Sequence, residues 1–386
     1  METSHDAASQ DHKQSPPAED WRSRLAILPA LEAVEDWSTP FVVMDLDLVD
    51  KNIVTIERFF SNKSANVRPH IKTHKCSAIA RNQVAAHGAG VTCSTTNEVE
   101  AMVAAGIDDI LLANVVTDRQ RLAALARSAQ KARVMVNVDS EVAVTLLIEA
   151  VEQVGASLGV LIEYDIGMRR NGVRSTSQGI ELAELAARSP YLEVRGVSAY
   201  EGHLVDVEDR EERREKVLQA FEPALELLDQ LQRRGFDASV LTGGSTATYQ
   251  TSVLIPQMTD VQAGTYLAMD ETYRHLAPEF VPTFVVAGSV LTSRQDGSLV
   301  LDIGVKRIGI DWGDPVLVGV DAAFRYIAEE HTVFQVLSGK RPGVGERVAM
   351  VPGHACTTLT RYRRIVGSRN GNVEAIFDVD GRDTLD

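Results

Sequence analysis

The chain has 386 residues, enough for two domains of ordinary size, and 44% of its residues are hydrophobic, which supports substantial cores. Its net charge of −15 is spread along the sequence, so neither nucleic acid nor an anionic membrane surface is expected as a partner. The three cysteines argue against a disulfide framework, and no apolar run approaches the roughly 18 residues of a membrane span.

Residues 1–24 are polar and include Ser, Gln, Asp, His and a proline pair. They lack the apolar core of a secretory signal peptide, so the sequence predicts a disordered leader in a cytoplasmic protein. A short apolar segment at residues 41–44 lies before the first regular strand–helix unit. We expect this segment to form a strand that returns to join the second domain.

Strand-like and helix-like segments alternate from there to about residue 267. Residues 97–105 and 210–234 have apolar residues at helical spacing, with Asn97 as the expected N-cap of the first helix. Short buried strands that alternate with helices indicate a parallel sheet, and eight units predict a TIM (β/α)8 barrel over residues 25–282. An open doubly wound sheet is the alternative, but no glycine-rich dinucleotide turn follows the first strand. The strand-like runs are residues 67–71, 91–94, 109–113, 133–138, 158–164, 192–200, 238–241 and 261–267.

The pattern changes after Pro282, where strand-like segments are separated by turns and show no strong helical period. The sequence therefore predicts a second, mostly-β domain over residues 283–386. Its strand-like segments are residues 284–291, 299–303, 315–320, 346–351 and 373–377.

Lys72 lies directly after the first predicted barrel strand, within the sequence Arg-Pro-His-Ile-Lys-Thr-His. A lone lysine is most often a solvated side chain. At the carboxyl end of a barrel strand, however, it points into the mouth where such folds carry out chemistry. There its amine can form a Schiff base with a carbonyl group.

Glycine and hydroxyl residues follow the seventh predicted strand and lie at the eighth, in segments 242–246 and 263–266. Each segment alone is typical of an ordinary turn. Loops at these two places in a barrel commonly bind phosphate, because glycines let backbone N–H groups approach and hydroxyls donate further hydrogen bonds. A phosphate site opposite a strand-end lysine matches a cofactor with an aldehyde at one end and a phosphate at the other, pyridoxal 5'-phosphate (PLP).

The chain resembles the fold-type III PLP-dependent enzymes, in which an alanine-racemase-like barrel precedes a β domain. Within that class it resembles the D-serine dehydratase / D-threonine aldolase family. The matching segments lie between residue 38 and about residue 380, and include residues 68–75, 165–172, 264–266 and 352–356.

The resemblance assigns the Schiff base to Lys72 rather than to Lys75, which is expected on the following helix. It also implies that Arg170 contacts the phenolic-oxygen side of the cofactor and that Tyr200 packs against the cofactor ring. The residues that it assigns to the phosphate are Thr246, Gly264 and Thr265.

His354 and Cys356 form a His-x-Cys pair in the β domain, which we expect to be extended here. Residues two apart in a strand point to the same side, so this imidazole and thiolate can share one metal ion, although such a pair is more often structural. In the family that the chain resembles, this position supplies two ligands to a divalent metal beside the cofactor. A thiolate with an imidazole favours zinc, and a carboxylate in place of Cys356 would suit manganese better.

The resemblance implies a PLP- and metal-dependent lyase that acts on D-amino acids with a β-hydroxyl group. Dehydration of D-serine, D-threonine or D-3-hydroxyaspartate to a 2-oxo acid and ammonia is the favoured reaction, because His-x-Cys is similar to the dehydratase pattern. Aldol cleavage to glycine and an aldehyde is the alternative, since residues 200–203 resemble the aldolase-like branch. An amino acid racemase and a non-catalytic PLP carrier are further alternatives. A homodimer is implied by analogy.

Other polar residues near these motifs have weaker assignments. His70 and His74 flank Lys72 and are expected either to tune it or simply to pack, and His203 is expected near the pocket. Asp311 is interpreted, with Asp302 and Lys306, as an interface or surface charge. Cys76 and Cys93 are interpreted as small core residues.

Overall fold

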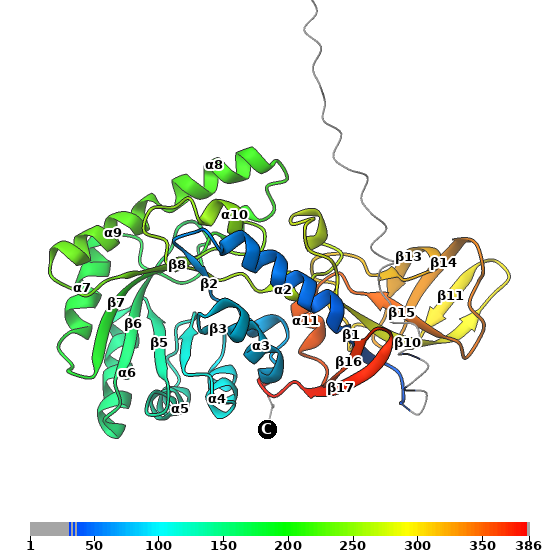
Figure 1. Ribbon diagram of the computed structural model, residues 1–386, viewed down its shortest axis with the longest axis horizontal. Helices are drawn as coiled ribbons and strands as arrows, with labels where there is room; N and C mark the ends of the chain where they lie inside the picture. The colour runs from blue at the N-terminus through cyan, green and yellow to red at the C-terminus, as the bar shows by residue number, and fades with distance from the viewer. Residues whose placement is uncertain (1–30, 32–33, 35–36, 384–386) are drawn as a thin grey trace, which may run out of the picture.

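The computed structural model describes Leu31, Val34 and residues 37–383 of the chain. The predicted leader, residues 1–24, lies outside the described residues. Figure 1 shows two parts side by side, a ring of strands wrapped by helices and an assembly of β-strands. Helices α2 (Leu46–Phe60) and α11 (Ala355–Leu359) lie near the place where the two parts meet.

Eight parallel strands form the first part, in the order β2-β9-β8-β7-β6-β5-β4-β3. A parallel bridge between His70 and Thr92 joins the segment after β2 to β3 and closes the ring. The predicted (β/α)8 barrel is therefore confirmed. The strands are β2 (Asn66–Val67), β3 (Val91–Cys93), β4 (Asp109–Leu112), β5 (Arg133–Val138), β6 (Leu158–Tyr164), β7 (Leu192–Ala199), β8 (Val240–Gly243) and β9 (Asp260–Val261).

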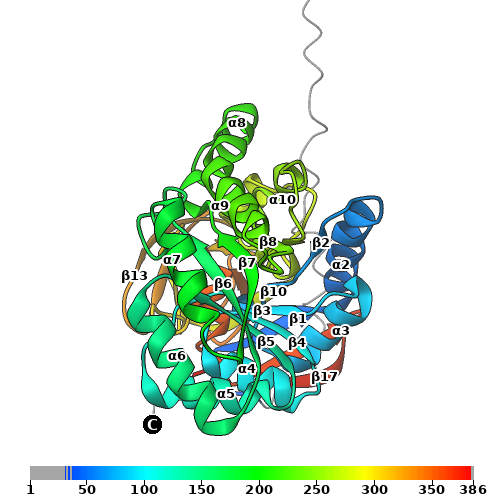
Figure 2. The ribbon, with the colours of Figure 1, turned by 90° about the vertical axis from the view of Figure 1, so that its left-hand side faces the viewer.

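Helices surround these strands, as the view in Figure 2 shows. Most begin at a polar cap: the side chain of Ser140, for example, accepts a hydrogen bond from the backbone N–H of Ala143 at the start of α6. Helix α6, for example, buries Leu147 and Val151 on one apolar stripe. The helices are α3 (Ser77–His87), α4 (Thr96–Ala104), α5 (Arg119–Ala129), α6 (Glu141–Val154), α7 (Thr176–Ala186), α8 (Arg210–Ala220), α9 (Glu222–Arg233) and α10 (Tyr249–Ser252).

The first and last predicted strands of the barrel are shorter than expected. Strand β2 ends at Val67, and residues Ile71–Thr73 form a 3₁₀ turn, η2. Strand β9 has two residues, and Thr265–Leu267 form another 3₁₀ turn, η4. The apolar residues of both turns are buried, so the hydrophobic pattern predicted their burial but not their backbone conformation.

The predicted helix over residues 210–234 is two helices, α8 and α9, which meet at Phe221. Pro223 lies in the first turn of α9, the part of a helix that tolerates proline, and the chain restarts its helix there. The N-cap of α4 is Thr95, whose hydroxyl accepts from the backbone N–H of Glu98 at 3.3 Å, and not Asn97.

The second part contains nine strands, and the segment at 41–44 lies among them as predicted. Strand β1 (Phe41–Asp45) pairs antiparallel with β10 and parallel with β16, so both of its edges are hydrogen-bonded. The main order is β13-β14-β11-β10-β1-β16-β17, and β15 pairs with β10 and β12. The bounds are β10 (Phe284–Ser293), β11 (Ser298–Leu301), β12 (Val316–Leu317), β13 (Asp321–Ile327), β14 (Thr332–Ser338), β15 (Arg347–Val351), β16 (Arg364–Arg369) and β17 (Asn372–Asp378).

The sequence did not predict β13, β14 or β16. Strands β13 and β14 are only partly buried and carry few apolar residues in a row, so their pattern resembles that of a loop. Strand β16 begins and ends with arginine, which hides its buried centre at Ile365 and Val366. No helix among the described residues is long and apolar enough to cross a membrane.

Candidate active site

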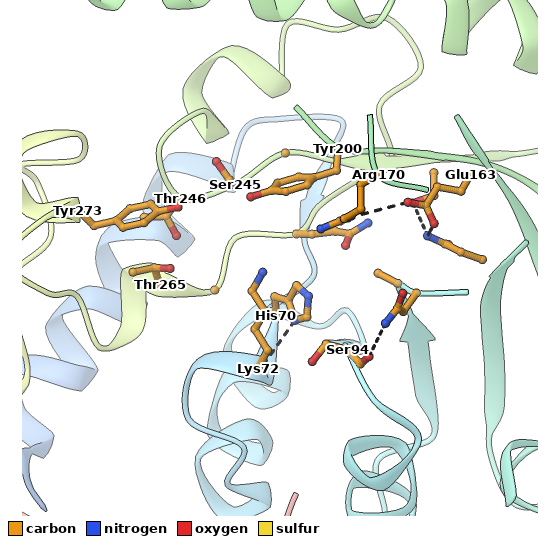
Figure 3. A pocket seen from close by; sticks show the side chains of 17 residues that line it. His70, Lys72, Ser94, Glu163, Arg170, Tyr200, Ser245, Thr246, Thr265 and Tyr273 are labelled. Atoms are coloured by element: carbon orange, nitrogen blue, oxygen red, sulfur yellow. Dashed lines mark hydrogen bonds and ion pairs between the residues drawn. The ribbon is translucent and has the colours of Figure 1, made fainter. Parts of the chain in front are cut away.

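The cavity at the carboxyl ends of the barrel strands has a volume of about 210 Å³. The six residues to which the sequence analysis assigned the cofactor all line it, although they come from different loops of the barrel. Figure 3 shows Lys72 pointing toward the ring of Tyr200, with hydroxyl side chains on one side and Arg170 on the other. The six residues are Lys72, Arg170, Tyr200, Thr246, Gly264 and Thr265.

Lys72 occupies the middle of the turn η2, with its Nζ 5.8 Å from the centroid of the Tyr200 ring. His70 precedes this turn, and its Nδ1 accepts from the backbone N–H of Lys72 at 3.5 Å. Burial and the positive charges of Lys72 and Lys75 hold the pKa of His70 well below its usual value. A neutral His70 can accept this hydrogen bond, so it helps to orient the turn.

Arg170 also lies close to Tyr200, with its Cζ 5.6 Å from the ring centroid. The loop that carries Arg170 is pinned by Asp165, whose Oδ1 accepts from the backbone N–H groups of Gly167 at 3.1 Å and Arg169 at 2.8 Å. Burial alone would raise the pKa of Asp165, but these hydrogen bonds and Arg174 hold it below its usual value. These hydrogen bonds therefore fix the loop in which Arg170 lies at the cavity.

Three polar side chains inside the barrel were missed by the sequence analysis. Asn137 donates from Nδ2 to Glu163 Oε2 at 3.1 Å and to Ser198 Oγ at 3.2 Å, and Glu163 Oε1 lies 3.9 Å from Arg170 Nη2. Burial raises the pKa of Glu163. Each of the three residues lies in a mostly apolar part of a strand. The signal available in the sequence was therefore a single polar residue at a position that faces the inside of the barrel.

The hydroxyl and glycine residues form a cradle next to Lys72. Gly264 has no room for a side chain, since a Cβ there would lie 2.4 Å from the carbonyl oxygen of His70. Thr246 Oγ1 accepts from the backbone N–H of Tyr266 at 2.9 Å, which joins the loops after β8 and β9. Ser245, which lines the same cavity, belongs to the first of these loops.

Glu201 stabilises the loop after β8, which forms part of this cradle. It is fully buried, its Oε2 accepts from the backbone N–H of Gly244 at 3.2 Å, and its Oε1 accepts from the hydroxyl of Thr248. Burial raises the pKa of Glu201, while these hydrogen bonds oppose that shift. Glu201 thus ties the end of β7 to the loop after β8.

These residues fit PLP. The cradle of Ser245, Thr246, Gly264 and Thr265 offers hydroxyls and close backbone approach, and the carboxylate of Glu201 does not line the cavity, which suits a phosphate dianion. The Lys72 amine and the Arg170 guanidinium lie 5.8 and 5.6 Å from the centroid of the Tyr200 ring, where the amine could react with an aldehyde and the guanidinium could stabilise an ionised phenolic oxygen.

His354 and Cys356 lie beside this cavity rather than among its lining residues. They are not in a strand as the sequence predicted: His354 is the N-cap of α11, and Cys356 lies in the first turn of that helix. Their side chains nevertheless share a hydrogen bond, because the turn into the helix brings them together. Cys356 Sγ also lies 3.3 Å from the hydroxyl of Thr73, the residue after Lys72.

His354 and Cys356 each shift the pKa of the other. Burial alone would raise the pKa of Cys356, but the hydrogen bond with His354 and the positive charge of Lys72 hold it below its usual value. Burial lowers the pKa of His354, yet the contacts with Cys356 and Asp311 raise it to about 9. Each group therefore favours the charged form of the other.

A soft thiolate with an imidazole is a donor pair that fits a zinc ion. Within residues 37–383 no group of three or more His, Cys, Asp and Glu side chains is placed to hold a metal, so the protein offers these two donors. The neighbouring carboxylate, Asp311, already accepts hydrogen bonds from His354 and Thr357. The remaining coordination positions would be left to water or substrate.

The other residues singled out in the sequence lie elsewhere. Lys75 is in the turn before α3, not on it, and its Nζ pairs with Glu98 Oε1 at 2.5 Å. His74 is buried and bonded to Gln83 at 3.0 Å, away from the cavity. His203 is exposed and packs over Gly167 without lining the cavity.

Asp311 is exposed, as expected of a surface charge, but its Oδ2 also lies 2.6 Å from Nδ1 of His354, a contact that the sequence analysis did not predict. Cys76 and Cys93 are buried core residues as expected.

Two family models match the chain. The alanine racemase N-terminal domain matches residues 44–272, and the putative serine dehydratase domain matches residues 283–368. Together they cover the barrel and most of the β domain.

Individual relatives cover nearly the whole chain. A D-threonine aldolase from an Arthrobacter species is 31% identical over 350 residues, 89% of this chain and 92% of the relative. A 3-hydroxy-D-aspartate aldolase from Paracoccus denitrificans is 30% identical over 370 residues, 92% of this chain and 95% of the relative. A D-threo-3-hydroxyaspartate dehydratase from a Delftia species is 25% identical over 350 residues, 84% and 92% of the two chains.

The crystal structure of D-threonine aldolase from Filomicrobium marinum superposes with a TM-score of 0.86, at 31% identity over 90% of this chain and 96% of that one. The match therefore extends from the barrel through the β domain, in sequence and in fold. The chain belongs to the D-threonine aldolase / D-serine dehydratase family, the lyases that join an alanine racemase N-terminal domain to a serine dehydratase domain.

Proposed function

We propose that the protein is a PLP- and divalent-metal-dependent lyase that acts on D-amino acids with a β-hydroxyl group. The observation that carries this proposal is the adjacency of two sites. Lys72 lies in the cradle-lined cavity, and Thr73, the next residue, contacts Cys356 at 3.3 Å. A substrate attached in the cavity would have its β-carbon beside the His354–Cys356 pair.

Each residue has a role that its position supports. PLP would supply an electron sink, and a zinc ion held by His354 and Cys356 would supply a Lewis acid. Lys72 carries the cofactor and is placed to move a proton at the α-carbon of the substrate.

Two more features support the binding part of the proposal. Arg170 is assigned to the phenolic-oxygen side of the cofactor and Tyr200 to its ring, and both residues line the cavity. Thr246, Gly264 and Thr265 hold the phosphate, and each of them lines the cavity. A homodimer and a cytoplasmic location stay predictions.

Two observations favour different products. The Cys356 donor is similar to the dehydratase pattern and favours loss of the β-hydroxyl, with a 2-oxo acid and ammonia as products. The aldolases among the relatives, at 31% and 30% identity, favour cleavage of the Cα–Cβ bond to glycine and an aldehyde. We take dehydration as the first candidate and aldol cleavage as the second.

One assay decides between them. Purified protein with PLP and zinc is incubated with D-serine, D-threonine and D-3-hydroxyaspartate, and 2-oxo acid, ammonia, glycine and aldehyde are measured together. We expect turnover of at least one D-amino acid and none of its L-enantiomer. Cys356→Ala should keep the cofactor absorbance and lose turnover, because only the metal donor is removed. Full activity of this variant would defeat the metal assignment, and absence of all four products would defeat the proposed function.

A further inference from the structure

The loop before β12 contacts His354 in three ways. Asp311 Oδ2 lies 2.6 Å from His354 Nδ1, and the ring of Trp312 stacks on the imidazole with centroids 4.9 Å apart and planes 11° apart. The backbone of Gly309 also forms an antiparallel bridge with that of His354. One loop therefore determines the hydrogen bond of His354, the orientation of its ring and the position of its backbone.

The same loop is fixed at its other contacts. Asp311 Oδ1 accepts from the hydroxyl of Thr357 at 2.6 Å, and the backbone N–H of Gly309 donates to Thr358 Oγ1 at 2.9 Å. Trp312 also stacks on Tyr273, with ring centroids 5.4 Å apart and planes 15° apart. Tyr273 lines the cofactor cavity, so the stack connects the cavity wall to His354.

The hydrogen bond to Asp311 selects one nitrogen of His354. When Nδ1 carries the proton and donates it to a carboxylate, the lone pair of Nε2 is left free to bind a metal ion. Asp311 is 49% exposed at its side chain, so solvent screens its charge and the main effect is geometric. Trp312 then restricts rotation of the ring about that bond.

We propose that Asp311 is a positioning residue for the metal site: it holds His354 in the orientation that presents Nε2 beside Cys356, and Trp312 fixes the ring plane. This inference rests on the proposed function, because it presumes that His354 and Cys356 bind a metal. It assigns Asp311 no contact with substrate or cofactor.

The test measures metal affinity directly. Wild type and variants loaded with PLP are titrated with zinc against a chelating indicator, and cofactor absorbance is followed in the same samples. Asp311→Ala should weaken zinc binding about 10- to 100-fold, the range typical for loss of such an outer partner. The cofactor absorbance should not change. Asp311→Asn keeps an oxygen that accepts from Nδ1, so its affinity should stay within about 3-fold of wild type.

A matched control is Asp314→Ala, which removes an exposed aspartate from the same loop and should bind zinc like wild type. Unchanged zinc affinity in Asp311→Ala would overturn the inference. The proposed function would still stand if the wild type is active. Zinc binding by Asp311→Asn that is 10-fold or more weaker than that of wild type would overturn the orientation argument, and this measurement remains decisive if Asp311→Ala does not fold. Wild type that binds no zinc would defeat the metal part of the proposed function itself.

Discussion

Lys72 is the residue on which the cofactor assignment depends. Two lysines lie three residues apart, but their surroundings differ: Lys72 Nζ faces the Tyr200 ring in the cavity, whereas Lys75 pairs with buried Glu98. An amine held in an ion pair is not free to react, so Lys72 alone of the two is placed to carry the cofactor.

We therefore predict that Lys72→Arg abolishes covalent attachment of PLP. The guanidinium keeps the positive charge near Tyr200 but cannot act as the nucleophilic amine. Borohydride reduction of the PLP-treated protein followed by peptide mapping measures this, and the wild type should carry the label on the peptide that contains Lys72. The control is Lys75→Arg, which keeps the ion pair with Glu98 and should label normally. A label on any other peptide of the wild type would sink the assignment.

At the scale of elements, the C-terminal segment fastens the region that carries Lys72. Helix α3 has no side-chain cap of its own, but Asp380 Oδ1 accepts from the backbone N–H of Ser77 at 2.8 Å, and the Ser77 hydroxyl donates to its Oδ2. The backbone N–H of Gly381 donates to the carbonyl of Lys75 at 2.8 Å. A residue about 300 positions away thus caps the helix that follows the turn carrying Lys72.

Asp380→Ala should lower the free energy of unfolding by about 1 kcal/mol, the usual contribution of an N-cap. It should also weaken PLP binding, because the turn before α3 loses its anchor. Urea unfolding followed by circular dichroism gives the first quantity, and titration of the apoprotein with PLP gives the second. Asp378→Ala, at the exposed end of β17, is the matched control. Equal stability and affinity in both variants would show that the segment contributes nothing to the turn.

At the scale of the whole molecule, the β-rich part takes one of its strands, β1, from the segment that precedes the barrel. Strand β1 lies between β10 and β16, which do not pair with each other, so the sheet is interrupted without it. Val42, Val43 and Met44 are fully buried there. The chain therefore forms one strand of the β-rich part before it forms the barrel, and the sheet of residues 283–383 is incomplete without that strand.

Residues 283–386 alone should not fold, because two new edges and an apolar surface would be exposed. The end of β1 lies beside the start of β10, with the backbone N–H of Asp45 donating to Thr283 at 2.7 Å. Joining residues 38–45 to residue 283 through a two-residue Asn-Gly turn should therefore restore the sheet as a hairpin.

Dispersion of amide NMR signals measures this restoration. Val43→Lys in the fused strand should abolish it, since it buries a charge. A folded fragment that lacks β1 altogether would contradict the prediction.

Residue types and spacing were sufficient to predict much of this protein. Short apolar strands that alternate with amphipathic helices predict a barrel. The spacing of apolar residues in each element shows which of its faces must be buried. The sequence also predicted the position of the site, because functional residues of a barrel lie at the carboxyl ends of its strands. The lysine after the first strand and the glycine and hydroxyl segments near the last two strands follow this rule.

Tertiary structure decided what connects residues distant in sequence. Asp311 became the partner of His354, Asp380 the cap of α3, and Asn137 and Glu163 the polar interior of the barrel. The turn at His354 and Cys356 forms a helix start rather than a strand, and packing against η2 and the loop 309–313 determines it. Local patterns record burial and backbone preference, whereas hydrogen bonds between distant segments depend on three-dimensional proximity, which no local pattern encodes.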